Sequence, residues 1–385
     1  MCLIEIKIKL ILFVMILLCF NIGLVGTQVS FILQGQNEEF VAPSDLFVPL
    51  KFEISASGEV LILHGRQGQQ AMHYRTSEGK WQRILGQGVG PGEAVFSLSF
   101  VWQKKAKEIY LQAFEPRKVI LFKQDQADQW KVKKEWKISS YYYGLRLFSG
   151  EGGNWLMAGF ATARSIISKD QDSIYSLFEL DEKFEFKRGL LKQKEFYSNL
   201  LPGIKDRSNE WLDRKNLFAG GFLGFCSGSK VYQIWSWSPR LSWYDLNTGE
   251  QGHFYLNGPN YKWIEYTGAM VREQKIDSRE FNRKYQPEFF NKYSSNFILS
   301  SFDDKILLIH SVSNDGFSKT LEAVIAGHDG KILGSGLLNP AEYEIGLFHF
   351  DGERRLLFHL YEDLEKEGRW LLQTYRLSWP GMTGN

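Results

Sequence analysis

Three histidines stand in similar sequence contexts, because His64, His310 and His359 each follow a short apolar run. Imidazole nitrogens are common ligands of zinc, iron and copper ions, so a shared metal site is the chemistry that these residues could support. The three runs belong to the first, fifth and sixth of six repeated units. In a closed ring of six units, equivalent positions in neighbouring units are rotated by roughly 60° about the axis. We therefore expect polar strand ends that are too far apart to share one ion, and we expect no cofactor.

A second group of candidates consists of aromatic and arginine side chains in the middle of the chain. Its members are Arg207, Trp211, Arg214, Trp235, Trp237, Trp263, Tyr266 and Arg272. Exposed aromatic rings stack on sugars and apolar peptide side chains, and tryptophan and arginine often dominate the energy of protein interfaces. These residues are therefore candidates for binding a protein, peptide or glycan partner. The alternative is that the aromatics around Trp235 and Trp237 pack between the repeated units.

The glycine-rich string GQGVGPGE, from Gly86 to Glu93, is of the kind that can cradle a phosphate group. A phosphate-binding loop of that kind continues into a Lys-Ser or Lys-Thr pair and a helix. Neither follows in this chain, because a strand pattern begins at Phe96. The chain also has no Gly-x-Ser-x-Gly nucleophile motif and no calcium-loop spacing. The sequence therefore identifies no catalytic residue.

Charge and cysteine content exclude further classes of function. The chain has 46 basic and 44 acidic residues, so its net charge of +2 leaves no excess to neutralise a nucleic-acid backbone. Cys2 and Cys19 lie in the N-terminal leader, and Cys226 is the remaining cysteine. An intramolecular disulfide and a cysteine-based zinc site are therefore excluded in the mature chain.

Residues 1–26 have the pattern of a secretory signal peptide. Lys7 and Lys9 precede the apolar run of residues 10–20, and small residues follow the run. We expect an exported protein, in the periplasm or at the surface of a bacterium. The alternative is an uncleaved N-terminal anchor, which would be the chain's only attachment to a membrane. Lipidation at Cys19 is disfavoured, because Leu18 occupies a position that normally needs a small residue.

The elements that must position these side chains are short strands in a repeating order. Apolar second strands are expected to begin at Glu59, Glu108, Asn154, Lys230, Lys305 and Glu353. Most neighbours in this series are about 45 to 50 residues apart, which is the length of a four-stranded propeller blade. Two of the spacings are longer by nearly 30 residues, which indicates two insertions. The fold is therefore predicted to be all-β: a single six-bladed β-propeller with four-stranded antiparallel blades, spanning residues 29–380.

The ends of the chain predict how the ring closes. The sixth unit has three strand patterns, and the chain then ends without a fourth. Residues Val29 to Gln34 form a spare strand pattern before the first unit, so we expect them to supply the outer strand of the last blade. This role requires cleavage of the leader at or before about Gln28, which agrees with a signal peptide that ends near Gly26.

A GPGE corner lies at the junction of the first two units, and a strand, a polar gap and another strand follow it. In these features the chain resembles the six-bladed β-propeller family of exported bacterial proteins related to NHL-repeat propellers. The resemblance covers roughly residues 40–379, and it implies fold and export. Members of that family are mostly uncharacterised, so it implies no catalytic residues.

Two insertions interrupt the period, at about residues 192–221 and 257–295, and the second contains a helix pattern from about Tyr266 to Tyr285. Each falls between the fourth strand of one unit and the first strand of the next, and such connections emerge on one face of a propeller. We therefore expect a monomeric binding or scaffold protein that engages its partner through this face. The alternative role of the insertions is merely to cap the ring. The alternative function is a metal-dependent hydrolase or lyase, similar to a lactonase, with its site at the propeller axis.

Overall fold

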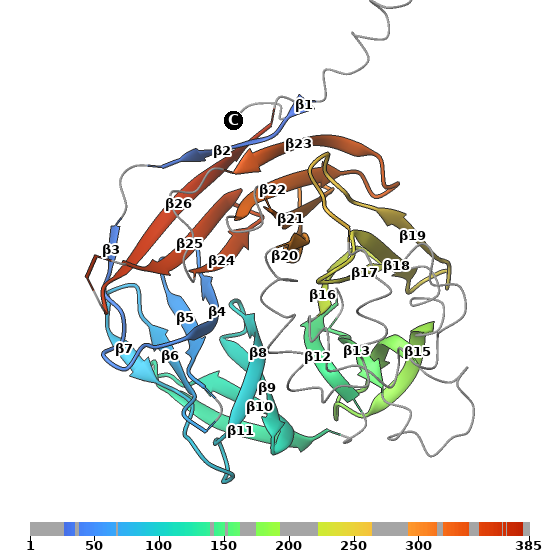
Figure 1. The fold of residues 1–385 in the computed structure, drawn as a ribbon. Helices are drawn as coiled ribbons and strands as arrows, with labels where there is room; N and C mark the ends of the chain where they lie inside the picture. Colours follow the sequence, from blue (N-terminus) through green and yellow to red (C-terminus); the bar gives the residue numbers. More distant parts are fainter. Residues whose placement is uncertain are drawn as a thin grey trace, which may run out of the picture.

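The structure is a computed structural model, and its regular elements are β-strands arranged in six sheets around a central axis (Figure 1). It describes residues 27–34, 38–66, 68–138, 142–150, 153–161, 175–192, 222–263, 292–313, 319–338, 346–363, 365–366 and 368–379. Each sheet contains four consecutive strands, or three in the last blade, paired in an antiparallel fashion. The fold is a six-bladed β-propeller, as the repeat pattern predicted. No helix among the described residues is long and apolar enough to cross a membrane.

The first three blades follow one another along the chain, and in each of them the strands run in order from the innermost to the outermost. Blade 1 contains β4 (Pro49–Ile54), β5 (Val60–His64), β6 (Ala71–Arg75) and β7 (Trp81–Arg83). Blade 2 contains β8 (Phe96–Gln103), β9 (Glu108–Glu115), β10 (Arg117–Gln124) and β11 (Trp130–Lys137). Blade 3 contains β12 (Tyr142–Ser149), β13 (Trp155–Ala161), β14 (Tyr175–Leu180) and β15 (Phe186–Lys192).

The remaining blades complete the ring. Blade 4 contains β16 (Phe222–Ser227), β17 (Lys230–Trp235), β18 (Arg240–Asp245) and β19 (Gln251–Tyr255). Blade 5 contains β20 (Asn296–Phe302), β21 (Lys305–Ser313), β22 (Lys319–Ala326) and β23 (Ile332–Leu338). Blade 6 contains β24 (Gly346–Asp351), β25 (Leu356–Glu362) and β26 (Trp370–Ser378). The second strands β5, β9, β13, β17, β21 and β25 begin within three residues of the positions that the sequence predicted.

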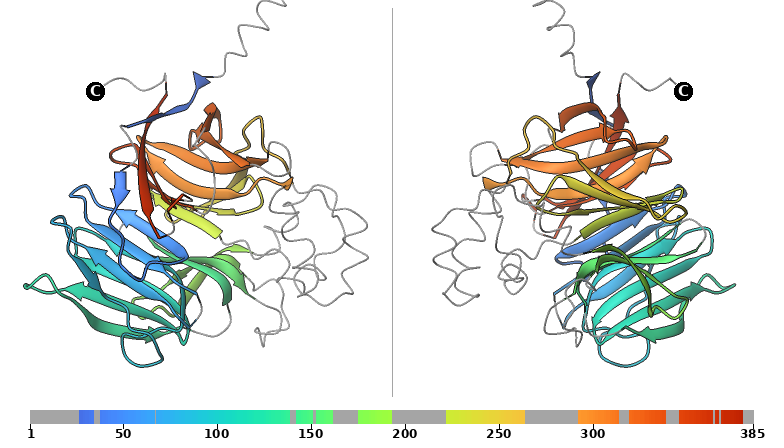
Figure 2. Two further views of the ribbon diagram at one scale, coloured as in Figure 1. Left: turned by 60° about the vertical axis from the view of Figure 1, so that its left-hand side comes forward. Right: turned by 90° about the vertical axis from the view of Figure 1, so that its right-hand side faces the viewer.

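The N-terminal segment closes the ring. Strand β2 (Ser30–Leu33) pairs antiparallel with the C-terminal half of β26, and β3 (Glu38–Phe40) pairs with its N-terminal half. Strand β1 (Thr27–Gln28) adds to blade 5 by pairing parallel with β23. In the side views, the blue N-terminal strand lies against the red C-terminal strand (Figure 2). The predicted outer strand of the last blade is confirmed, and the same segment also ties blade 5 to blade 6.

Strand direction gives the ring two distinct faces. Within a blade the chain forms the inner strand first and the outer strand last, so every link from one blade to the next begins and ends on the same face. We call this the connection face; it carries residues 41–48 before blade 1 and residues 84–95 before blade 2. The turns between third and fourth strands, such as the turn at Asp125 and Asp128, lie on the opposite face.

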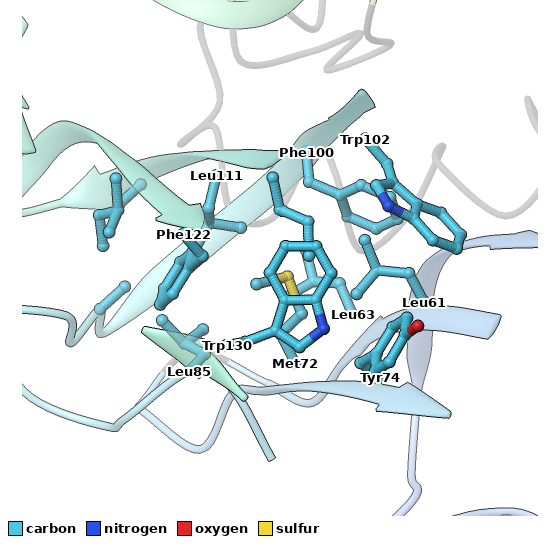
Figure 3. Packing of buried hydrophobic residues seen from close by; sticks show 14 residues of the cluster. Leu61, Leu63, Met72, Tyr74, Leu85, Phe100, Trp102, Leu111, Phe122 and Trp130 are labelled. Atoms are coloured by element: carbon cyan, nitrogen blue, oxygen red, sulfur yellow. The ribbon is translucent and has the colours of Figure 1, made fainter. Parts of the chain in front are cut away.

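Apolar side chains hold neighbouring blades together. Blades 1 and 2 share one buried cluster that includes Leu63, Met72 and Trp130, and the Trp130 ring packs against Tyr74 with ring centroids 5.2 Å apart (Figure 3). Comparable clusters join blade 2 to 3, 4 to 5, 5 to 6 and 6 to 1. Full burial of one such side chain stabilises the fold by roughly 1.5–3 kcal/mol, so the interblade clusters dominate stability. The outer strand β11 instead exposes several lysines, which protect a sheet edge from pairing with another chain.

The glycine corner from Gly86 to Glu93 is a structural link between blades 1 and 2. The Glu93 carboxylate accepts a hydrogen bond from the Gly90 amide at 2.9 Å, and Lys118 Nζ donates to the Gly90 carbonyl at 2.9 Å. Gly88 has a φ of +141°, and a Cβ atom there would overlap the Glu93 carboxylate. Glycine is needed at this position because the loop wraps around a carboxylate of its own chain.

Candidate functional site

The strand ends that border both insertions lie on the connection face. Strand β15 ends at Lys192 and β16 begins at Phe222, while β19 ends at Tyr255 and β20 begins at Asn296. Each of these positions is either the end of an outer strand or the start of an inner strand. Both insertions therefore begin and end on the same face of the ring, as expected from the sequence.

Most of the insertion residues lie outside the described part of the chain. This applies to Arg207, Trp211, Arg214, Tyr266 and Arg272. It also applies to the predicted helix and to the leader of residues 1–26. Of the candidates for partner binding, the structure places Trp235, Trp237 and Trp263.

The second insertion leaves and rejoins the ring at one point. The Ser294 amide donates to the Lys262 carbonyl at 3.0 Å, and the Lys262 amide donates to Ser294 Oγ at 2.9 Å. Lys262 Nζ also donates to the carbonyl of Ser313 at the end of β21, at 2.6 Å. The two ends of the insertion are therefore fastened to each other and to blade 5.

A buried carboxylate fixes the residues just before this point. Glu322 on β22 is 1% exposed, and its Oε1 accepts a hydrogen bond from Asn260 Nδ2 at 3.0 Å. His310 Nε2 lies 3.3 Å from the other oxygen of Glu322, and the His310 ring meets the edge of Tyr261. Burial raises the pKa of the Tyr261 hydroxyl, which therefore stays protonated. A Cβ atom at Gly258 would overlap the Glu322 carboxylate, so the chain can pass this close only as glycine.

An aromatic group lies beside the anchored segment on the connection face. Trp263 packs against Tyr255 with ring centroids 5.6 Å apart and against Tyr261 at 5.9 Å. Tyr255 is 37% exposed and Trp263 is partly exposed, whereas Tyr261 is buried. His253 meets the edge of Tyr255 at 5.9 Å, and its pKa is lowered by burial and by the nearby Arg240. We call Tyr255 and Trp263 the blade-4 aromatic pair.

Trp235 and Trp237 occupy a different environment from Trp263. They are 1% and 4% exposed, respectively. Trp235 ends β17, and its carbonyl accepts a hydrogen bond from Asn296 Nδ2 of blade 5 at 2.8 Å. Both side chains are packing residues of the ring and have no exposed surface on which a partner could stack.

The three histidines singled out from the sequence each have partners of their own. His310 lies beside Glu322 in blade 5. His359 stacks on Phe348 at 4.2 Å, and its Nδ1 lies 3.4 Å from Gln373 Oε1. Burial lowers the pKa of His359 to about 4, so this imidazole is neutral.

His64 lies in a cluster that was not predicted from the sequence. Its Nε2 is 3.0 Å from Nδ1 of His73 on β6, and His73 Nε2 is 3.5 Å from Asp45 Oδ1. His64 pairs with Ala71 across the β5–β6 hairpin, so His73 is its diagonal neighbour on the same face of the blade. The signal that could have found this contact is the pair of histidines that flanks the predicted hairpin.

The axis of the ring carries charged side chains from three blades. Lys51 on β4 donates to the Phe100 carbonyl at 2.6 Å and pairs with Glu53 at 3.0 Å. Burial lowers the pKa of Lys51 and of Arg146 on β12, and the charge of Glu53 opposes both shifts. Burial also lowers the pKa of His349 on β24 to about 4. Among the described residues of this region, the carboxylates of Glu53 and Asp351 thus lie near the cationic side chains of Lys51, Lys104 and Arg146.

This arrangement differs from the donor set that a metal-dependent hydrolase would need at the axis. Such a site requires three or more carboxylate, amide or imidazole groups that converge on one point. Among the histidine, cysteine, aspartate and glutamate side chains of the described ranges, the one group of three whose ligand atoms lie close together is Asp45, His64 and His73 in blade 1. The described residues therefore give no specific support to an axial metal centre.

Comparisons with known proteins identify the fold. No protein-family model matches the chain, and no curated protein matches it. Among solved structures, a member of the DUF4221 family from Bacteroides vulgatus aligns with a TM-score of 0.57 and 10% identity, covering 92% of this chain and 99% of that chain. A protein from Bacteroides fragilis that is described as exported aligns with a TM-score of 0.54 and 12% identity, covering 91% and 95%.

Virginiamycin B lyase from Staphylococcus aureus is also similar, with a TM-score of 0.45, 10% identity, and coverage of 91% of this chain and all of that chain. At these identities the similarity concerns fold, and it does not transfer the lyase reaction. The chain is a six-bladed β-propeller whose fold is similar to that of the two Bacteroides proteins.

Proposed function

We propose that this chain is an exported, monomeric binding protein that engages a protein, peptide or glycan through the connection face near blade 4. The observation that carries the proposal is the blade-4 aromatic pair. Tyr255 and Trp263 are accessible aromatic rings at the base of the second insertion. Among the described residues, many other large aromatic side chains are buried between blades, although Phe186 and Phe297 are also exposed.

The pair has the properties of an interface anchor. Trp263 is held from one side by Tyr261, which is itself fixed against His310. A rigid aromatic ring loses little conformational entropy on binding, so more of its contact energy contributes to affinity. Residues of this kind often contribute roughly 2 kcal/mol or more to an interface.

Export to the periplasm or the cell surface is part of the proposal. The signal-peptide pattern of residues 1–26 supports it. The similarity in fold to a Bacteroides protein described as exported also supports it. The ring closure is compatible with cleavage near Gly26, because the first paired residue is Thr27.

The experiment compares the variant Tyr255→Ala/Trp263→Ala with the wild-type chain. Both are immobilised and exposed to a glycan array and to an extract of the producing bacterium, and the affinity for the captured component is then measured. We expect the double variant to bind at least about tenfold more weakly, since 1.4 kcal/mol corresponds to a factor of ten. The thermal transition should remain within a few degrees of that of the wild type.

The control is Ile332→Ala, which removes an apolar side chain of similar exposure at the start of β23 on the opposite face. This variant should bind like the wild type. Equal binding by the wild type and the double variant would show that the partner contacts another surface. A large loss of thermal stability in the double variant would show that the pair is a packing element.

A further inference from the structure

We infer that Asp45, His64 and His73 form a binding site for one divalent transition-metal ion, of which Zn²⁺ is the best match. We call these residues the blade-1 triad. They come from three elements: the segment before β4, the end of β5 and the middle of β6. The site lies at the connection-face end of blade 1 and is separate from both the propeller axis and the blade-4 aromatic pair.

The two imidazoles already face each other at nearly the separation that a metal requires. His64 Nε2 and His73 Nδ1 are 3.0 Å apart, and the rings are almost parallel, with an interplanar angle of 15°. Two nitrogens bound to a tetrahedral zinc ion at about 2.0–2.1 Å lie roughly 3.4 Å apart. An increase of a few tenths of an ångström, together with a rotation of the rings that turns both lone pairs toward one side, would therefore allow both nitrogens to bind one ion.

Asp45 supplies the third ligand. One ligand atom from each of the three residues lies within 4.8 Å of the others, although the nearest contact of the Asp45 carboxylate, at 3.5 Å, is with His73 Nε2, the ring nitrogen that does not face His64. The two histidines are buried, but about half of the Asp45 side chain is exposed. The carboxylate can therefore move toward the ion, and its solvent side provides the path by which the ion reaches the imidazoles.

The protonation state of the triad suits a metal. In the hydrogen bond between two neutral imidazoles one nitrogen donates and the other accepts, and both lone pairs can face a metal ion when the protons lie on the outer nitrogens, His64 Nδ1 and His73 Nε2. Burial lowers the pKa of both histidines, and their proximity lowers that of His64 further. Neutral imidazole is the form that binds metal, so no proton has to be displaced at neutral pH.

The surroundings hold the ligands in place. The edge of Phe47 meets His64 at 5.9 Å, and Trp81 meets His73 at 6.3 Å. Gly65 follows His64 with a φ of +105°, and a Cβ atom there would overlap the carbonyl of Gln69. A tight turn and Phe47 therefore fix the end of β5, Trp81 packs on His73 of β6, and an apolar shell of this kind limits the access of water to a metal site.

The donor set selects the class of ion. Two imidazoles and one carboxylate, with room for water, are typical of zinc and of other first-row divalent ions. Calcium and magnesium prefer all-oxygen sites, and the triad contains no thiolate that would favour Cu(I). A bound ion would clamp the segment of residues 41–48 to blade 1, next to the point where the ring closes.

The test uses the mature full-length chain, purified without a polyhistidine tag and stripped of metal with a chelator. Zn²⁺ is titrated by calorimetry, and Co²⁺ is titrated by its visible d–d absorption, which reports tetrahedral coordination. We expect one ion per chain in both titrations and a higher thermal transition in the presence of Zn²⁺. A wild-type chain that binds less than stoichiometric metal would overturn the inference.

Variants locate the ion. His73→Gln should abolish the cobalt absorption, and Asp45→Asn should weaken Zn²⁺ binding by about tenfold or more. Asp45 is exposed, so its replacement leaves the core intact even if His73→Gln lowers the stability of blade 1. The matched control is His359→Gln, which replaces a buried histidine of blade 6 and should bind one ion like the wild type. Unchanged binding by Asp45→Asn and His73→Gln would place the ion elsewhere and contradict the inference.

Discussion

Individual buried imidazoles make the stability of this protein depend on pH. Burial lowers the pKa of His359 to about 4, whereas an unfolded chain has a histidine pKa near 6.5. Above pH 6.5 the residue is neutral in both states. Between pH 6.5 and about 4 the unfolded state binds a proton that the folded state does not bind, so stability falls as the pH falls.

The first prediction concerns this histidine. His359→Gln should reduce the loss of stability between pH 7 and pH 4.5, by up to roughly 3 kcal/mol, because the variant has no group that charges only in the unfolded state. The measurement is the urea midpoint of both proteins at a series of pH values. An identical pH dependence in the two proteins would show that His359 is charged in the fold or that another group dominates.

The second prediction concerns the glycine that passes the buried Glu322. Gly258→Ala should lower the free energy of unfolding by about 1–3 kcal/mol, because the new methyl group must displace a carboxylate that Asn260 and His310 surround. Urea unfolding measures the effect. Gly150→Ala is the control, since its Cβ atom would meet its nearest neighbour, Leu156, at 3.3 Å. Equal stability of the two variants would mean that Glu322 moves freely.

At the scale of strands, the N-terminal segment determines whether the ring is closed. Strand β2 supplies the outer edge of blade 6, and the Val29 amide donates to the Ser335 carbonyl of blade 5 at 3.0 Å. Val29 is also 1% exposed within the cluster that joins these two blades. Hydrogen bonds and apolar packing therefore both depend on this segment.

The third prediction is that deletion of residues 29–34 from the mature chain lowers the thermal transition sharply and promotes aggregation. The deletion exposes the unpaired edge of β26 and opens the interface between blades 5 and 6. Differential scanning calorimetry and light scattering measure the two effects. Thermal unfolding that stays the same without this segment would refute the role of β2 in closure.

The strand order was predictable from sequence because the second strand of each blade is a continuous apolar run that is buried on both sides. In the structure, all five residues of β5, Val60–His64, are buried, as expected for a strand that is covered on both sides. Strands β1 and β3 were missed, since two or three residues carry no periodic pattern. Their positions are set by the neighbouring strands β23 and β26 rather than by their own residues.

Side-chain partners were less predictable than strands. The contact between His64 and His73 depends on the register of a hairpin, and Asp45 reaches them from a connecting segment. The sequence grouped His64 with His310 and His359, because similar positions in a repeat look alike even when each has different partners. Trp235 and Trp237 could not be separated from Trp263 by sequence, since burial in a propeller depends on the neighbouring blade.

At the scale of the whole molecule, the axis brings together charges from different blades. The negative charge of Glu53 compensates the positive charges of Lys51 on its own strand and of Arg146 in blade 3. Removing one partner of a buried ion pair leaves the other charge uncompensated, at a cost that is usually several kcal/mol.

The fourth prediction is therefore that Glu53→Gln lowers the free energy of unfolding by about 3 kcal/mol. Equilibrium unfolding in urea measures the loss. The control is Glu78→Gln, a carboxylate in the exposed turn before β7, which should leave stability nearly unchanged. Similar stabilities of the two variants would show that water or another anion already compensates the axial cations.

The most direct test of the central claim, that the connection face near blade 4 binds the partner, is to remove the second insertion and measure affinity. Lys262 and Ser294 are hydrogen-bonded to each other, so a short Gly-Ser linker can replace residues 264–291 without moving the ring. In a shortened chain that also carries Tyr255→Ala and Trp263→Ala, we predict that the affinity for the captured partner falls by at least about a hundredfold, since both anchoring rings are lost, while the thermal transition is unchanged. Binding with wild-type affinity by the shortened chain would contradict the account.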